Sequence, residues 1–402
     1  MPGPGQELIK TSIGELALFG GVAAFSEPLH VGRPNLGDRT ALHRRIDGIL
    51  DRAWLTNDGP LVQELEKHVA AIAGVEHCIA TCNATLALEI AARSTGLTGE
   101  VILPSFTFVA TAHAMTLAGL EPVFCDIDPV THQLDVADVK RRITPRTSAI
   151  LPVHVWGHPS PVEELESLAR SHGLRLLFDS AHAFASSYRG RPIGSFGDAE
   201  IFSFHATKFV NSAEGGAIVT NDGELADKAR LLRNFGFSNY DSIESLGMNA
   251  KMSELSAAMG LTTLERMDEF IRVNERNIRL YKRELANVSG IRILENDPRD
   301  DCNYQYVVIE IDSAETGLDR DALKDVLWAE NVLARRYFYP GCHRVPPYAD
   351  RAERLEHTEA VTQRVLSLPN GTSVSAEAVE QVCAIIRTAI ENGPAITQKL
   401  AR

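Results

Sequence analysis

The stretch Phe202-Ser-Phe-His-Ala-Thr-Lys208 completes an apolar run that begins at Ala199, so it places a lysine just after a predicted buried strand. Downstream, Glu214-Gly-Gly216 permits a tight turn, and another strand is expected at 216–220. Lys208 is therefore predicted to lie on a loop between two core strands. Catalytic side chains are common in such loops.

A second stretch, Leu176-Leu-Phe-Asp-Ser-Ala-His182, puts Asp179 at the carboxyl end of another apolar run, where open α/β sheets place ligands. A lysine that can form a Schiff base and a carboxylate that keeps a pyridine nitrogen protonated together indicate pyridoxal phosphate chemistry. Ser203 could hydrogen-bond the phosphate. Taken singly, Asp179 could merely end a strand and Lys208 could be a surface lysine.

Two upstream segments also turn from a predicted strand into a predicted helix. The first runs into Asn83-Ala-Thr85, where the free N–H groups of the helix start would suit a phosphate, although Asn83 could equally be an ordinary N-cap. In the second, Val101 to His113, Phe106 or Phe108 could stack on a cofactor ring or simply pack in the core.

Strands and helices alternate along most of the chain, which predicts an α/β protein with a largely parallel sheet covered on both faces. Strands are expected at 77–81, 101–104, 122–126, 148–153, 174–178, 199–204 and 216–220, with helices between them such as 161–172 and 223–234. A long helical pattern follows from Lys251 to Val288.

The predicted organisation is an arm, a large domain and a smaller α+β domain. The ranges are an N-terminal arm at 1–33, a large domain at 34–261 and a C-terminal domain at 262–402, the last with a strand at 304–311, a helix at 319–331 and a final helix at 376–392.

Five motifs occur in an order that resembles the DegT/DnrJ/EryC1/StrS family of nucleotide-sugar aminotransferases. They are Asn83-Ala-Thr, Pro104-Ser-Phe-Thr-Phe-Val-Ala-Thr-Ala-His, Asp179-Ser-Ala-His-Ala, Ser203-Phe-His-Ala-Thr-Lys and Glu214-Gly-Gly. The resemblance runs from about Pro34 to the C-terminal helix. It implies pyridoxal phosphate as cofactor and the fold type I of its transferases, with a mostly parallel sheet in the large domain.

The resemblance also implies a role for each matching residue. Lys208 would form the Schiff base and Asp179 would face the pyridinium nitrogen. Relatives with histidine at the lysine position are dehydratases, so Lys208 favours transamination. The other implied cofactor contacts are His182 near the 3-hydroxyl group, Ala84, Thr85 and Ser203 at the phosphate, and Phe108 over the ring.

A homodimer with shared active sites is implied by Asn249, in Gly247-Met-Asn-Ala-Lys-Met252. The matching segment of the family reaches the phosphate of the neighbouring subunit's cofactor. Lys251 stands where relatives often have arginine, and it is predicted to contact the substrate.

The formal net charge of −13 and pI of about 5.5 disfavour nucleic acid as a partner, so a phosphorylated substrate needs local positive charge. The stretch from Ala334 to Arg344 offers it, with Arg335, Tyr339 and His343 as predicted substrate contacts. The same stretch could also be a solvated, partly packed loop.

Composition favours an ordinary enzyme of the cytoplasm. The six cysteines have no CxxC spacing and read as reduced thiols, and the histidines lack zinc-site spacing, so no metal is expected. The apolar run from Leu16 to Phe25 is too short for a membrane span and has acidic Glu15 before it, so neither a membrane anchor nor a signal peptide is predicted.

Within the family, Trp54-Leu-Thr-Asn-Asp-Gly-Pro60 and His205-Ala-Thr-Lys208 look most like enzymes that aminate C4 of dTDP-4-keto-6-deoxyglucose. Glutamate would be the donor, and dTDP-4-amino-4,6-dideoxyglucose would enter deoxysugar biosynthesis for an antibiotic, another natural product or a surface glycan. The alternatives are amination at C3, a pyridoxal phosphate enzyme for a cyclitol or carbocyclic ketone, and a non-catalytic binding protein of the same fold.

Overall fold

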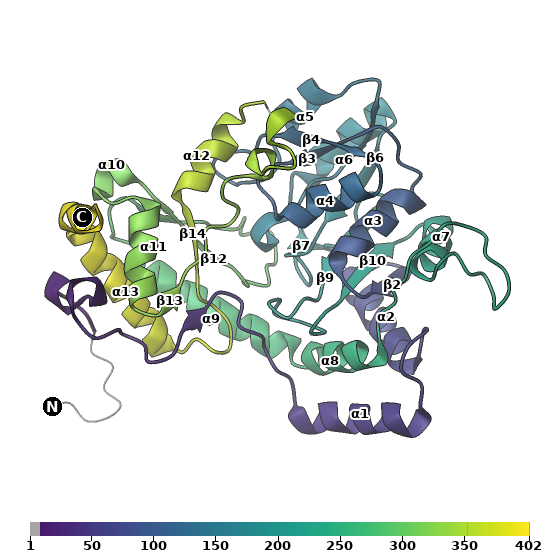
Figure 1. Cartoon of the computed structure of the whole chain (residues 1–402), viewed down its shortest axis with the longest axis horizontal. Coiled ribbons are helices and arrows are strands. Elements are labelled where there is room, and N and C mark those ends of the chain that lie inside the picture. The colour runs from purple at the N-terminus through teal and green to yellow at the C-terminus, as the bar shows by residue number, and fades with distance from the viewer. Residues whose placement is uncertain (1–8, 352, 402) are drawn as a thin grey trace.

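The computed structural model describes residues 9–351 and 353–401, and its largest element is a seven-stranded sheet in the order β2-β10-β9-β6-β5-β3-β4 (Figure 1). The strands are β2 His77–Thr81, β3 Glu100–Pro104, β4 Glu121–Cys125, β5 Thr147–Ile150, β6 Arg175–Asp179, β9 Ala199–Ser203 and β10 Gly216–Thr220. All seven predicted strands are present, although β5 ends at Ile150 and not at 153. Only β10 is antiparallel to its neighbours in this sheet, which confirms the mostly parallel α/β prediction.

The strand directions bring the predicted site residues to one edge of the sheet. Both β2 and β9 are antiparallel to β10, so β2 runs in the same direction as β9 and the other parallel strands. The carboxyl ends of β2, β3, β6 and β9 therefore meet at one edge. Asn83, Phe108, Asp179 and Lys208 lie at or just after these four ends.

Helices cover both faces of the sheet (Figure 1). They are α2 Pro60–Ala73, α3 Ala84–Ser94, α4 Val109–Leu117, α5 Val136–Arg142, α6 Val162–His172, α7 Gly223–Arg233 and α8 Glu254–Leu264. Alternate strand residues point to opposite faces, so Phe178 packs in the core that includes α2 and α6, whereas Leu177 packs in the core that includes α3 and α7. Burial on both faces explains why the strands read as continuous apolar runs.

A smaller body follows around the antiparallel sheet β11-β12-β14. Its elements are α9 Met267–Leu285, β11 Ile291–Ile293, β12 Val307–Ile311, α10 Ser313–Thr316, α11 Arg320–Ala329, β13 Val332–Leu333, α12 Glu356–Arg364, β14 Val365–Leu368, α13 Ala376–Glu391 and α14 Gly393–Leu400. Their apolar side chains form a separate core. The predicted domain boundary at 262 falls within α8 and stays a prediction.

Three expectations for this region differ from the structure. The long helical pattern from 251 is two helices, α8 and α9, because Arg266 leaves helical geometry, with φ −109° and ψ 10°. No glycine or proline marks that break. The strand expected from 304 begins only at Val307, and the helix ending near 392 is not the last, because Gly393-Pro394 starts α14 with a proline in its first turn.

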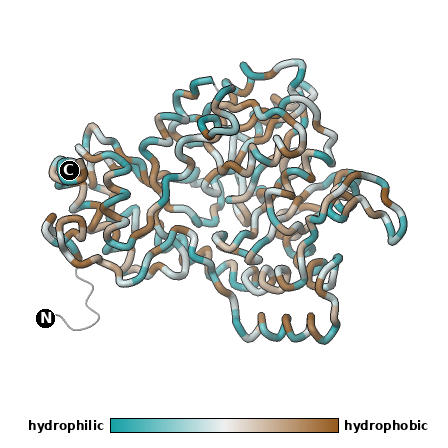
Figure 2. Tube along the Cα trace, in the orientation of Figure 1, coloured by the Kyte–Doolittle hydropathy of each residue, from teal (hydrophilic) through white to brown (hydrophobic). Residues whose placement is uncertain are grey.

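The N-terminal segment runs along the smaller body before it reaches α1 Arg39–Arg52 (Figure 1). Strand β1, Leu29–His30, pairs in parallel with β13. The first eight residues of the predicted arm lie outside the described residues. Helix α1 lies against α8 at the margin of the larger body, and Figure 2 shows hydrophilic and hydrophobic residues alternating along it. A small hairpin, β7 Ser187–Tyr188 and β8 Arg191–Pro192, precedes β9.

Within residues 9–351 and 353–401, no helix has both the length and the apolar character that crossing a membrane requires.

Candidate active site

A cavity of about 370 Å³ opens at the carboxyl edge of the large sheet. The predicted cofactor residues that line it are Ala84, Thr85, Phe108, Asp179, His182, Ser203 and Lys208. They come from four separate turns of the sheet edge, so the fold brings together side chains that the sequence separates by more than a hundred positions.

Asp179, the last residue of β6, is only 5% exposed and is held at both carboxylate oxygens. The Thr111 hydroxyl donates to Oδ2 at 2.7 Å, and the Ala181 backbone N–H donates to Oδ1 at 3.1 Å. Burial raises the pKa of this carboxyl group, while the two hydrogen bonds and the Lys208 charge oppose the rise. The carboxylate is therefore fixed in direction and aimed at the cavity.

Lys208 reaches the same cavity from the loop after β9, as predicted. Its ammonium donates to the Tyr306 hydroxyl at 3.2 Å. Burial lowers the lysine pKa from 10.5 to about 8, although the Asp179 charge works in the opposite direction. At neutral pH a larger fraction of Lys208 is therefore the reactive neutral amine than in an ordinary lysine.

The start of α3 forms an anion cradle beside these two groups. The Asn83 side chain accepts the Leu86 N–H at 2.9 Å, which confirms the N-cap interpretation. The N–H groups at the very start of a helix have no intrahelical partner, so those of Ala84 and Thr85 stay available. Gly216 permits the close approach of β10, since a Cβ there would lie 2.5 Å from the Ala84 nitrogen.

His182 forms one wall of the cavity and is buried. The Trp156 backbone N–H donates to its Nδ1 at 3.3 Å, and burial lowers the imidazole pKa well below 6.5. The ring is therefore neutral at pH 7, with its proton on Nε2, and it can donate one hydrogen bond.

Of the two phenylalanines considered for ring stacking, only Phe108 lines the cavity, and its side chain is 59% exposed. Phe106 is buried in an aromatic cluster with Trp156 and Phe338. The backbone explains the difference, because Phe108 is the N-cap residue of α4 and Phe106 still follows the strand end.

The buried carboxylate of Glu200 holds the turn that follows Asp179 by hydrogen bonds. Glu200 is fully buried, and it accepts the Ser180 hydroxyl at 2.5 Å and the backbone N–H groups of Gly194 and Phe196 at 2.7 and 2.9 Å. Ser180 is the residue after Asp179, so this network supports the position of the Asp179 carboxylate from the adjacent strand.

The four predicted substrate contacts have different positions. Arg335 lines the cavity. Lys251 and Tyr339 lie outside the cavity lining. Lys251 donates to the Asn234 side chain at 2.8 Å, and the Tyr339 ring packs beneath the guanidinium of Arg336. His343 is buried and bonds the Ser105 hydroxyl. Their roles as substrate contacts stay predictions.

Asn249 is exposed and lies outside the cavity lining of this chain. It forms an isolated bridge with Asn234, just before Ala250 enters the core. Its predicted contact with a second subunit's cofactor is not tested by a single chain.

Val31, Tyr306, Tyr337 and Phe338 line the cavity but are not among the site residues predicted from the sequence. The aromatic stretch after Ala334 was recognised, but the chain turns at residues 337–340, so Tyr337 and Phe338 line the cavity and Tyr339 does not. Val31 and Tyr306 carry no local signal, because each reaches the site only through the packing of the smaller body and the arm.

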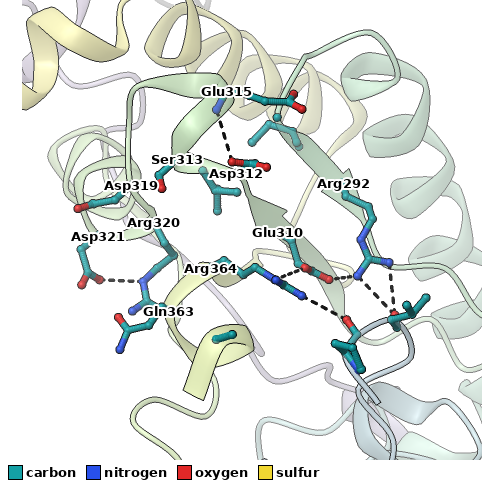
Figure 3. Close-up of a pocket in the computed structure, with 16 residues that line it drawn as sticks. Arg292, Glu310, Asp312, Ser313, Glu315, Asp319, Arg320, Asp321, Gln363 and Arg364 are labelled. Atoms are coloured by element: carbon teal, nitrogen blue, oxygen red, sulfur yellow. Dashed lines mark hydrogen bonds and ion pairs between the residues drawn. The ribbon is translucent and has the colours of Figure 1, made fainter. Parts of the chain in front are cut away.

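A larger cavity, of about 1030 Å³, lies on the smaller body (Figure 3). Figure 3 shows Arg292 and Arg364 turned toward Glu310, and Arg320 toward Asp321. None of the predicted catalytic or cofactor residues lines it. Its arginines pair with acidic neighbours, and two of its other carboxylates, Asp312 and Asp319, cap helices. The chemistry is therefore assigned to the smaller cavity.

The smaller cavity fits pyridoxal phosphate in three independent respects. The start of α3 offers N–H groups for a phosphate, Asp179 offers a buried carboxylate for a protonated ring nitrogen, and Lys208 offers an amine of lowered pKa. His182 offers a donor for an oxygen on the ring.

Comparison with known proteins identifies aminotransferases as relatives of this chain. Residues 38–387 match the model of the DegT/DnrJ/EryC1/StrS aminotransferase family. The chain is 37% identical to a dTDP-4-amino-4,6-dideoxy-D-glucose transaminase of Shigella dysenteriae, over 90% of this chain and 99% of that protein. It is 36% identical to a GDP-perosamine synthase of Caulobacter vibrioides, over 84% and 92%. A crystal structure of DesI in the presence of its TDP-sugar product superposes with a TM-score of 0.94 at 50% identity, over 97% of this chain and all of that one.

Proposed function

The chain belongs to the DegT/DnrJ/EryC1/StrS aminotransferase family and is a pyridoxal phosphate-dependent aminotransferase, and we propose that it aminates C4 of dTDP-4-keto-6-deoxyglucose. The strongest support is the meeting of Lys208, Asp179 and the α3 anion cradle in one cavity. The name of the Shigella relative supports the dTDP-linked substrate and the C4 position, and the DesI complex with its TDP-sugar product supports a TDP-linked sugar.

Pyridoxal phosphate, when bound, supplies an aldehyde for the amino group and a ring that accepts the electrons of a broken C–H bond. The N–H groups of Ala84 and Thr85 and the Ser203 hydroxyl would hold its phosphate. Asp179 would stabilise positive charge on the ring nitrogen, with its direction fixed by Thr111 and Ala181.

Lys208 would then move the protons of both half-reactions. In the first half-reaction its neutral amine would take the α-proton of the amino donor and give it up to the bound cofactor. In the second half-reaction the same amine would take a proton back and deliver it to C4 of the sugar. A pKa of about 8 suits both directions near neutral pH, since acid and base forms are both populated. Tyr306 accepts a hydrogen bond from Lys208 and so holds the amine within the cavity.

Glutamate is the proposed amino donor, and dTDP-4-amino-4,6-dideoxyglucose is the proposed product, for use in deoxysugar biosynthesis of the kind that serves antibiotics or surface glycans. We place the enzyme in the cytoplasm. The six cysteines are free, which fits a reducing compartment.

The working unit in this proposal is a homodimer with shared active sites. Large apolar side chains are exposed after α1 and on the loop after α7, and they are Trp54, Leu55, Tyr240, Ile243 and Leu246. Exposed apolar groups of this kind mark interaction surfaces. Asn249 is exposed and close in sequence to the second group, so it is accessible to a partner subunit.

The function is tested in the reverse direction with purified protein, dTDP-4-amino-4,6-dideoxyglucose and 2-oxoglutarate. We expect glutamate and the 4-keto sugar to form in equal amounts, and Lys208→Ala to abolish both. The 3-amino isomer and an aminocyclitol serve as competing substrates. Turnover of either one, without turnover of the 4-amino sugar, would replace the proposed substrate.

A further inference from the structure

The N-terminal arm precedes the stretch that matches the family model and still reaches the active site. The family model begins at residue 38, whereas Val31 lines the cavity that holds Lys208. Leu16 and Phe25, earlier in the arm, are buried in the core of the smaller body. In the structure the arm continues to the start of α1, so its described part is residues 9–37, and this part is packed structure and not a loose extension.

One buried carboxylate, that of Glu330, binds three groups of the arm. Glu330, fully buried after α11, accepts the Lys10 ammonium at 2.5 Å and the backbone N–H groups of Ala17 and Ala24 at 2.7 and 2.8 Å. A buried charge is costly unless it is paired and hydrogen-bonded, and here each oxygen of Glu330 is satisfied by the arm.

After the Glu330 contacts, the arm continues to Val31, which lines the cavity together with Arg335. Leu29 and His30 pair with Val332 and Leu333 as two parallel strands. Each strand then continues into the cavity wall, one with Val31 and the other with Arg335. The positions of these two wall residues are thus coupled by backbone hydrogen bonds.

The next residues tie the arm to the Lys208 loop. Gly32 has φ of +74°, and a Cβ there would lie 3.0 Å from the Thr207 Cβ, so the arm touches the residue before Lys208. The Asn35 amide donates to the Phe209 carbonyl at 3.0 Å and accepts the Thr372 hydroxyl at 2.6 Å. Asn35 therefore bridges the lysine loop and the smaller body.

We infer that the arm is a substrate-discriminating part of the active site, in which Val31 forms the wall against which the nucleotide sugar fits. The inference rests on the proposed function. A cavity of about 370 Å³ is near the small end of ligand pockets, which span roughly 300–1,000 Å³, and it must admit both cofactor and substrate. A nucleotide sugar must then fit closely against the cavity lining, to which half-buried Val31 belongs, whereas an amino acid donor is much smaller.

The test measures binding without turnover. Every protein carries Lys208→Ala, is loaded with cofactor, and is titrated calorimetrically with dTDP-4-amino-4,6-dideoxyglucose. Val31→Phe should weaken binding by about tenfold or more, because one badly fitted side chain in a pocket costs about that factor. Val22→Phe is the matched control, since Val22 is in the same arm but is 88% exposed and outside the cavity lining. It should leave the affinity unchanged.

The companion measurement uses the active enzyme. Val31→Phe should raise KM for the nucleotide sugar about tenfold while KM for glutamate changes less than about twofold. Val31→Ala, which cannot clash, should also shift the sugar affinity. Equal sugar affinity in wild type, Val31→Phe and Val31→Ala, with normal wild-type turnover, would overturn the role of the arm alone. A wild-type protein that neither binds nor converts the dTDP sugar would overturn the proposed function and this inference together.

Discussion

At the scale of single residues, Lys208 and Asp179 form a pair in which each changes the proton affinity of the other. Burial makes the lysine easier to deprotonate, and the nearby carboxylate limits that effect. The enzyme needs both tendencies, since a lysine held fully protonated could not act as a base, and one held fully neutral could not return a proton.

This balance predicts how the cofactor-free protein reacts with an amine reagent. Lys208 labelling should rise with a midpoint near pH 8, since only the neutral amine reacts. In Asp179→Asn the midpoint should move to lower pH, because the carboxylate that stabilises the ammonium is gone. Peptide mass spectrometry across a pH series reads both midpoints. Lysines elsewhere in the same digest provide the internal comparison, with a usual pKa near 10.4. A midpoint at pH 10 for Lys208 would contradict the desolvated environment.

At the scale of elements, the arm and strand β13 depend on the charge of Glu330. Glu330→Gln keeps the shape but removes the charge that pairs with Lys10, leaving a buried ammonium. Loss of one partner of a buried pair costs about 3 kcal/mol, which corresponds to roughly 4 °C in Tm for a chain of 402 residues. Hydrogen exchange should rise in residues 17–30 before it rises elsewhere.

A surface ion pair provides the control for that experiment. Glu163 pairs with Arg189 at 2.7 Å, but both side chains are largely in solvent. Glu163→Gln should change stability by less than about 0.5 kcal/mol, because exposed pairs contribute little. Equal effects of Glu163→Gln and Glu330→Gln on Tm would show that the arm is not anchored by its buried carboxylate.

At the scale of the whole molecule, shared active sites predict recovery when two inactive variants are mixed. Lys208→Ala and Asn249→Trp would each be inactive alone. A mixed dimer has one site with both lesions and one intact site, so a fully exchanged mixture should regain about a quarter of wild-type activity. Activity is measured after co-expression with two different affinity tags.

The matched control pairs Lys208→Ala with Asp179→Asn. These residues lie in the same cavity of one chain, so every site in that mixed dimer carries a lesion. This mixture should stay inactive. Recovery in the control, or none in the Lys208→Ala and Asn249→Trp mixture after verified exchange, would contradict the shared-site arrangement.

The sequence by itself determined the seven strands of the large sheet and the positions of Asp179 and Lys208 at its edge. A strand that is buried on both faces must be apolar along its whole length, so a polar residue directly after it stands out. The helix start at Asn83 was equally visible, because its capping residue is local.

Only the tertiary structure decided how the cavity is closed. Val31, Tyr306 and Tyr337 come from the arm and the smaller body, and long-range packing alone brings them to Lys208. The break between α8 and α9 at Arg266 was likewise hidden, since no glycine or proline marks it. A short-range pattern fixes where a strand ends, but the wall opposite that end is set by contacts between segments far apart in the chain.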